Sequence, residues 1–132
     1  MSTQPNGARR RPSALKLLVA LFGAPLAWVA QMGLSEPLAA QVCYPGSQPL
    51  SMPAWPSLQT ALALVSGACL LAALASALAA WSVWRTTRGQ GEGDGRARFL
   101  AVLGLMSAGL FVAAVLFTAL AVVLIAPCAG KP

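Results

Sequence analysis

Few side chains in this sequence could take part in chemistry. The chain contains no histidine, three acidic residues and three cysteines, Cys43, Cys69 and Cys128. Without histidine it lacks the usual haem ligand, the commonest zinc ligand and the commonest general base. The cysteines form neither a CxxC nor a CxxCH motif, so the sequence does not indicate c-type haem attachment. We therefore expect no enzymatic activity, no metal site and no cofactor.

Glu36 is the only acidic residue in or next to an apolar segment. An ionisable group inside a membrane is a candidate functional residue, here for carrying protons or binding a cation. The alternative is a hydrated carboxylate near the outer interface, since Pro37 favours the end of a helix there. Gln31 lies deeper in the same segment. We expect its amide to hydrogen-bond a neighbouring helix, with a functional role as the alternative.

The composition identifies the elements that position these residues as membrane helices. Hydrophobic residues make up 58% of the chain and charged residues only 9%, against roughly 25% charged residues in soluble proteins. Such a chain cannot form a charged shell, whereas a bilayer solvates apolar side chains. The net charge of +6 can indicate nucleic-acid binding. Here the basic residues lie at the ends of apolar segments, so we expect no nucleic-acid partner.

Three apolar segments predict an all-α integral membrane bundle of three helices, over residues about 14–42, 58–84 and 99–126. Each segment is long enough to cross a hydrocarbon core of ~30 Å. A cleaved signal peptide is the alternative for the first segment. We expect no cleavage, because Leu38-Ala39-Ala40 is a poor site after so long an apolar run.

The remaining residues predict two loops and two tails. Residues 43–57 hold four prolines and no charge, which predicts a stiff extracytoplasmic loop. Residues 85–98 are charged and rich in glycine, which predicts a flexible linker. The helical domain then covers residues 14–127, between a disordered cytoplasmic tail at 1–13 and a short outer tail at 128–132.

The distribution of lysine and arginine predicts the orientation. With the N-terminus in the cytoplasm and the C-terminus outside, only Lys131 lies on the outer side. Such a bias toward the cytoplasm is the normal pattern for membrane proteins. We expect a multi-pass protein of the bacterial cytoplasmic (inner) membrane. The eight basic residues on the cytoplasmic side are Arg9, Arg10, Arg11, Lys16, Arg85, Arg88, Arg96 and Arg98.

This orientation places Cys43 and Cys128 on the outer side, each just past the end of a helix. In a bacterium that side is the oxidising periplasm, so we expect a Cys43–Cys128 disulfide. Closing so long a loop contributes about 4 kcal/mol in the chain-entropy treatment. The alternative is two unpaired thiols. Cys69, in the middle of the second segment, is expected to act as a small hydrophobic residue.

Small residues recur on the second and third segments at spacings that favour close helix packing. They serve either the packing of the three helices or the docking of a larger membrane partner. In the second segment they are Ala68, Ala72, Ser76 and Ala80; in the third they are Gly104, Ala108, Gly109 and Ala113.

Four short stretches carry a resemblance to a known group of proteins. They are Phe22-Gly-Ala-Pro-Leu-Ala-Trp28 with Gln31, Cys43-Tyr-Pro45, Gly95-Arg-Ala-Arg-Phe-Leu100, and the apolar run ending at Pro127-Cys128. Together they resemble small uncharacterised bacterial membrane proteins associated with haem-copper cytochrome c oxidase gene clusters. The resemblance brings no activity or catalytic residue. It implies a partner, namely a terminal oxidase or its assembly machinery.

We therefore expect a non-enzymatic accessory or structural membrane protein. Its expected partners are the lipid bilayer and haem-copper oxidase subunits. The alternative is an oligomeric small transporter or ion pathway that uses Glu36, as small multidrug-resistance transporters use a glutamate in their first helix. Those transporters, however, have four helices and a deeper glutamate. A pore former such as a phage holin is a third reading, although its commonest three-helix arrangement has the opposite charge distribution.

Overall fold

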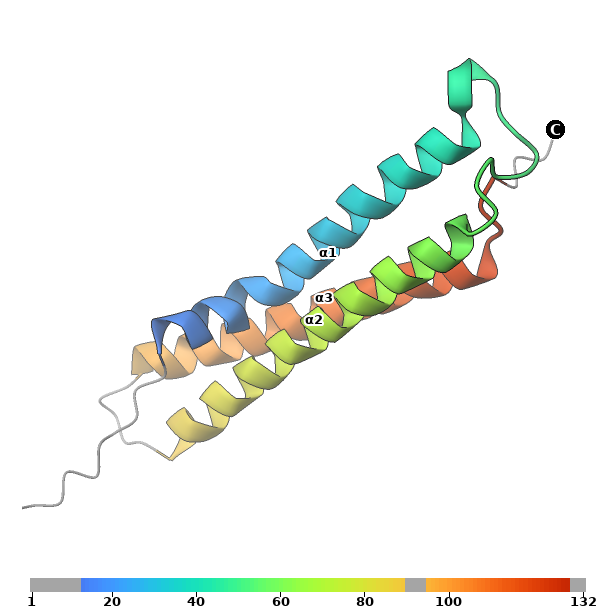
Figure 1. Ribbon diagram of the computed structural model, residues 1–132. Helices are drawn as coiled ribbons and strands as arrows, with labels where there is room; N and C mark the ends of the chain where they lie inside the picture. Colours follow the sequence, from blue (N-terminus) through green and yellow to red (C-terminus); the bar gives the residue numbers. More distant parts are fainter. Residues whose placement is uncertain (1–12, 90–94, 129–132) are drawn as a thin grey trace, which may run out of the picture.

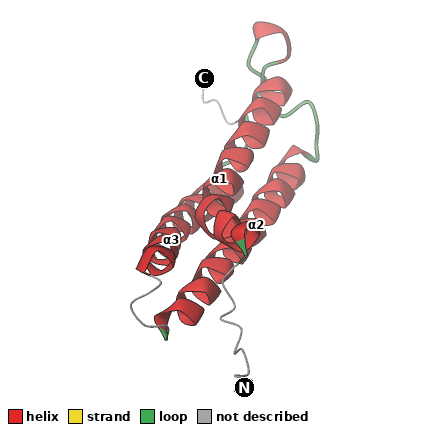
Figure 2. Ribbon diagram, turned by 90° about the vertical axis from the view of Figure 1, so that its left-hand side faces the viewer, coloured by secondary structure: helices red, strands yellow, loops and turns green. Residues whose placement is uncertain are grey.

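The computed structural model describes residues 13–89 and 95–128 (Figure 1). This part of the chain forms three α-helices and one short 3₁₀ turn, and it contains no strand (Figure 2). The helices are α1 (Ala14–Cys43), α2 (Leu58–Arg88) and α3 (Gly95–Leu124), and the turn is η1 (Pro45–Ser47). All three helices are long and apolar enough to cross a membrane. The fold is the predicted all-α three-helix bundle.

The helices run up, down and up, so their ends gather at two poles of the bundle (Figure 1). We call one pole the arginine end, where α1 begins, α2 ends and α3 begins. All described lysines and arginines lie there: Lys16, Arg85, Arg88, Arg96 and Arg98. We call the other pole the disulfide end, where Cys43 is bonded to Cys128. The described chain therefore carries its positive charge at one pole.

Helix α1 begins at a capping serine and continues through two prolines. The Ser13 hydroxyl accepts a hydrogen bond from the backbone amide of Lys16, at 3.3 Å, which satisfies one of the free amides of the first turn. Pro25 and Pro37 both lie inside the helix. The prediction that Pro37 ends or breaks the helix is therefore wrong. Membrane helices tolerate proline because other groups bond the backbone atoms that proline leaves free.

The helix bounds at the arginine end differ from the predicted ones. Residues 85–88 belong to α2 and residues 95–98 belong to α3, although we predicted them to be linker. The prediction followed the apolar runs, whereas arginine is itself a good helix former. Residues 90–94, which we also predicted to be linker, fall outside the described residues, as do residues 1–12 and 129–132 of the predicted tails.

The proline-rich loop folds back on the end of α1. The amide of Leu50 donates to the carbonyl of Cys43, at 2.9 Å, and the amide of Ala54 donates to the carbonyl of Val42, at 3.4 Å. The last carbonyls of a helix have no partner within it, so the loop acts as a cap. Gly46 has a φ of 73° in the turn η1, a conformation that glycine adopts without strain.

The core of the bundle is narrow and built from small side chains. Ala24, Ala73 and Ala108 are fully buried or nearly so and belong to one cluster where all three helices meet. The large apolar side chains instead point outward, where lipid would surround them. Among them are Leu64, Leu71, Leu78, Met106, Leu110 and Phe117. The small core lets the helix backbones approach closely, as in other membrane bundles.

Aromatic rings mark the arginine end of α2. The rings of Trp81 and Trp84 contact each other at a tilt of 41°, with 5.2 Å between their centroids. The guanidinium of Arg88 lies 5.0 Å from the centroid of the Trp84 ring. Tryptophan prefers the membrane–water interface, and a cation over its ring is attracted by the ring face. This group is therefore suited to the headgroup level.

Candidate functional site

Gln31 connects all three helices near the middle of the bundle. Its side chain is 1% exposed. The amide nitrogen donates to the hydroxyl of Ser66 on α2, at 3.1 Å, and the amide oxygen accepts from the hydroxyl of Thr118 on α3, at 2.8 Å. A buried amide without partners would be costly in a medium without water. Gln31 therefore links the three helices through two partners, Ser66 and Thr118, that were not predicted from the sequence.

Ser76 makes a second polar connection, nearer the arginine end. Its hydroxyl donates to the carbonyl of Val19, at 2.7 Å, and accepts from the amide of Ala24, at 3.1 Å. Both groups belong to α1, and Ala24 directly precedes Pro25, which has no amide hydrogen of its own. The buried hydroxyl of α2 thus bonds the backbone of α1 beside the proline.

Two glycines allow these close approaches. A Cβ atom at Gly23 would lie 2.8 Å from Cβ and Oγ of Ser76, and a Cβ at Gly104 would lie 3.1 Å from the carbonyl oxygen of Ala20. Ordinary carbon contacts are longer than either distance. Glycine at these positions lets α1 pack against α2 and against α3.

The eight small residues singled out in the sequence divide into two sets. Ser76, Ala80, Gly104 and Ala108 are buried between the helices. The other four are exposed on the outside of the bundle: Ala68, Ala72, Gly109 and Ala113. A Cβ at Gly109 would meet no atom within 4 Å. The bundle uses the first set for its own packing and leaves the second set uncovered.

Cys43 and Cys128 form a disulfide with a Cα–Cα distance of 5.2 Å. It joins the end of α1 to the residues that follow α3. Leu58 and Leu62 of α2 are buried in the same cluster as Cys43, so the bond closes a small apolar core at the disulfide end. Cys69 is a free, buried cysteine beside the central alanines.

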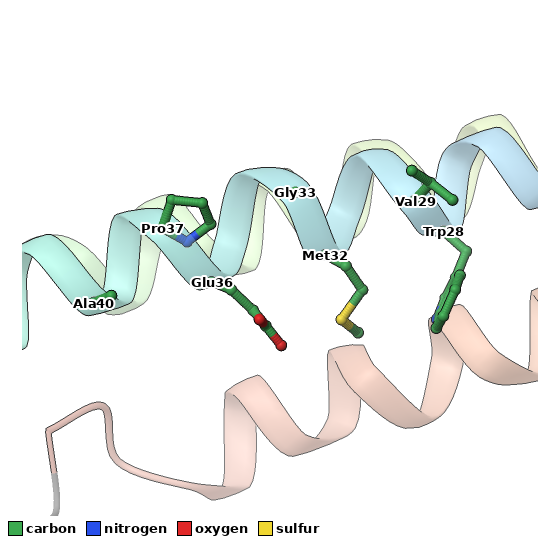
Figure 3. Close-up of a pocket in the computed structure, with 7 residues that line it drawn as sticks. All are labelled: Trp28, Val29, Met32, Gly33, Glu36, Pro37 and Ala40. Carbon is green, nitrogen blue, oxygen red and sulfur yellow. The ribbon is translucent and has the colours of Figure 1, made fainter.

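Glu36 projects from α1 toward α3. Figure 3 shows its carboxylate on the same side of α1 as Met32 and Trp28. On that side the Trp28 ring packs against the Phe111 ring of α3, with 5.8 Å between the ring centroids. Glu36 is exposed and two full helical turns before the end of α1. The structure does not bring a lysine or arginine of the described residues to it, because all of these lie at the arginine end.

Glu36 borders a hollow that we call the α1–α3 groove. The groove has a volume of about 260 Å³ and continues at the disulfide end into a wider hollow of about 740 Å³. Ser35 lies in its wall, and the Ser35 Oγ is buried without a hydrogen-bond partner. The lining of the groove includes Ser35, Glu36 and Ala39 of α1 and Thr118, Ala121 and Val122 of α3, with Leu62 of α2 also in contact.

The described residues contain no group of three or more His, Cys, Asp and Glu side chains that could hold a metal ion. The site can provide one carboxylate, one unsatisfied hydroxyl and an apolar groove. Comparisons with protein-family models, curated proteins and solved structures found no match to this chain.

Proposed function

We propose that this chain is a non-enzymatic accessory subunit of a larger membrane complex. The observation that carries the proposal is the outward position of Ala68 and Ala72 on α2 and of Gly109 and Ala113 on α3. Between membrane helices, small residues permit the close backbone contact that drives association, since lipid provides no hydrophobic force between helices. The three helices do not cover these four positions, which leaves them available to the helices of a partner.

The resemblance to proteins of haem-copper cytochrome c oxidase gene clusters supports a terminal oxidase, or the proteins that assemble it, as the partner. This part of the proposal rests on the stretches of sequence quoted above. The chain would contribute helix surface and stability to the complex, with the haem and copper ligands coming from other subunits.

The proposed setting is the bacterial inner membrane, with the arginine end in the cytoplasm and the disulfide end in the periplasm. The support is the excess of lysine and arginine on one side, eight against one, under the positive-inside rule. A disulfide at the opposite pole agrees with an oxidising compartment there.

The proposal is tested by affinity purification of the tagged chain in a mild detergent, followed by mass spectrometry. We expect oxidase subunits in stoichiometric amount. Ala72→Leu should reduce their recovery at least several-fold, because the larger side chain prevents close contact. Ala63→Leu is the matched control, since Ala63 is also exposed on α2 and nine residues turn a helix by about 180°. Recovery of the chain alone in several detergents would contradict the proposal.

A second candidate function is an oligomeric transporter or ion pathway, and it is favoured by the Glu36 carboxylate, which borders a groove and pairs with no basic side chain of the described residues. A single chain of three helices encloses no path, so this function requires several copies. Transport of a cation that is unchanged in Glu36→Gln vesicles would exclude it. Loss of transport in that variant, with the purified chain oligomeric, would favour it over the accessory role.

A further inference from the structure

Packing between α1 and α3 loosens between the middle of the bundle and the disulfide end. Between Gln31 and Cys43 no residue of α1 is buried, and after Val115 no described residue of α3 is buried. The side chains that face each other there include Ala39 and Ala121, which are too small to fill the space between the helices. The α1–α3 groove is therefore a consequence of residue size, and it is open to the surrounding membrane.

No lysine or arginine among the described residues pairs with the carboxylate at the edge of this groove. Lys16, the nearest basic residue of α1 in sequence, precedes Glu36 by twenty positions, which is about 30 Å along a helix. A charged group facing lipid without a partner is costly. An ammonium group bound at Glu36 would remove that cost.

The depth of Glu36 matches the level of lipid headgroups. Helix α1 has 30 residues, so it is about 45 Å long and, when centred, extends about 7 Å beyond each side of a ~30 Å hydrocarbon core. Glu36 lies seven residues before Cys43, about 10 Å from the helix end. Its Cα is then about 3 Å inside the core boundary, within reach of a headgroup.

From these observations we infer that the α1–α3 groove binds one phospholipid with a primary ammonium headgroup, as in phosphatidylethanolamine. An acyl chain lies between Ala39 and Ala121, and the ammonium group donates hydrogen bonds to the Glu36 carboxylate. The hydroxyl of Ser35, which lacks a partner inside the protein, provides a further polar group at the same place.

A lipid fits the groove better than a helix of a partner protein does. A phospholipid with an ammonium headgroup brings both an apolar chain for the groove and a positive group for Glu36. A single flexible acyl chain can enter a hollow of about 260 Å³. The inference is independent of the accessory role, because lipid binding is measured on the isolated chain.

The test is native mass spectrometry of the purified, delipidated full-length chain with equal amounts of phosphatidylethanolamine, phosphatidylcholine and phosphatidylglycerol. We expect the first lipid to be retained at least five-fold over the other two. Phosphatidylcholine has no N–H to donate, and phosphatidylglycerol is an anion. Glu36→Gln should bring the three lipids to within two-fold of one another, whereas Glu36→Asp should keep the preference.

Two further variants complete the test. Glu92→Gln, the same substitution between α2 and α3, should behave like the wild type. Ala121→Leu should fill the groove and lower the retention of all three lipids. Each variant is first checked for helical circular dichroism and for the Cys43–Cys128 bond, so that misfolding is recognised. Equal retention of the lipids by the wild type, or an unchanged preference in Glu36→Gln, would overturn the inference.

Discussion

Gly23 of α1 faces Ser76 of α2 so closely that a Cβ atom at Gly23 would lie 2.8 Å from the serine Oγ. The same hydroxyl bonds the carbonyl of Val19 and the amide of Ala24. The missing side chain of one residue thus makes room for the polar contact of the other. The amide that donates to Ser76 belongs to Ala24, the residue between Gly23 and Pro25.

Ser76→Ala should lower the free energy of unfolding by about 1–2 kcal/mol, because it leaves a buried amide and carbonyl of α1 without this partner. Unfolding in sodium dodecyl sulfate, followed by circular dichroism, measures the loss. Ser82→Ala is the matched control, since the Ser82 hydroxyl bonds only the carbonyl of Ala79 in its own helix. Equal losses in the two variants would show that the contact between helices contributes nothing.

Gly23→Ala should destabilise the bundle by about 1–3 kcal/mol, because the new methyl group meets Ser76 and forces α1 and α2 apart. Gly33→Ala, on the same helix, has open space at its Cβ and should be neutral or stabilising, since alanine favours a helix by up to about 1 kcal/mol over glycine. The same unfolding assay compares them. The explanation fails if Gly33→Ala is the more damaging of the two.

Gln31→Met keeps the side-chain volume but removes both links to Ser66 and Thr118, and it should cost about 1–2 kcal/mol. Thr118→Val removes one link and leaves the amide oxygen of Gln31 without this partner. The double variant should cost less than the sum of the two, because the residues share one hydrogen bond. Strict additivity in this cycle would argue against the bond.

The disulfide is tested by alkylation in denaturant and intact mass. Without reduction, only Cys69 should react, giving one label; after reduction, the three cysteines should give three. Cys69→Ser should give no label before reduction and two after it. Cys43→Ser should also lower stability by about 4 kcal/mol if chain entropy dominates. Three labels in unreduced wild type would show that the bond does not form in cells.

The proposed orientation is tested with alkaline phosphatase, which is active only in the periplasm. A fusion after Pro132 should be active, and a fusion within residues 90–94 should be inactive, because the arginine end is retained in the cytoplasm. A cytoplasmic reporter at the same two positions should give the opposite pattern. Activity of the internal fusion alone would mean that the bundle is inverted.

Some features could be predicted from the sequence because they depend on single segments. The three apolar runs are each long enough to span a bilayer, and a helix is the form that satisfies its own backbone there. The pairing of Cys43 with Cys128 followed from their matched positions at helix ends. Gln31 was expected to bond another helix, since a buried amide in lipid requires a partner.

The sequence also indicates which residues of α2 could make the polar contacts between helices. Ser66 and Ser76 are hydroxyl residues within the uncharged, apolar residues 58–84 of α2, and polar groups in such segments usually face other helices. Their spacing of ten residues is close to three helical turns, so both were candidates for one buried face. The partners that they find on α1 could not be predicted, because that depends on how the helices align.

The sequence by itself determined that the chain forms three membrane-length helices with basic residues at their ends. The tertiary structure decided which side of each helix faces inward. The predicted series at every fourth residue placed Ala68 and Ala72 with Ser76 and Ala80, but only the last two are buried. Four residues turn a helix by about 400°, so such a series drifts around the surface. Lipid accepts apolar side chains as readily as the core does. Hydrophobicity therefore carries no inward direction, and close packing around Gly23, Gly104 and Ser76 supplies it.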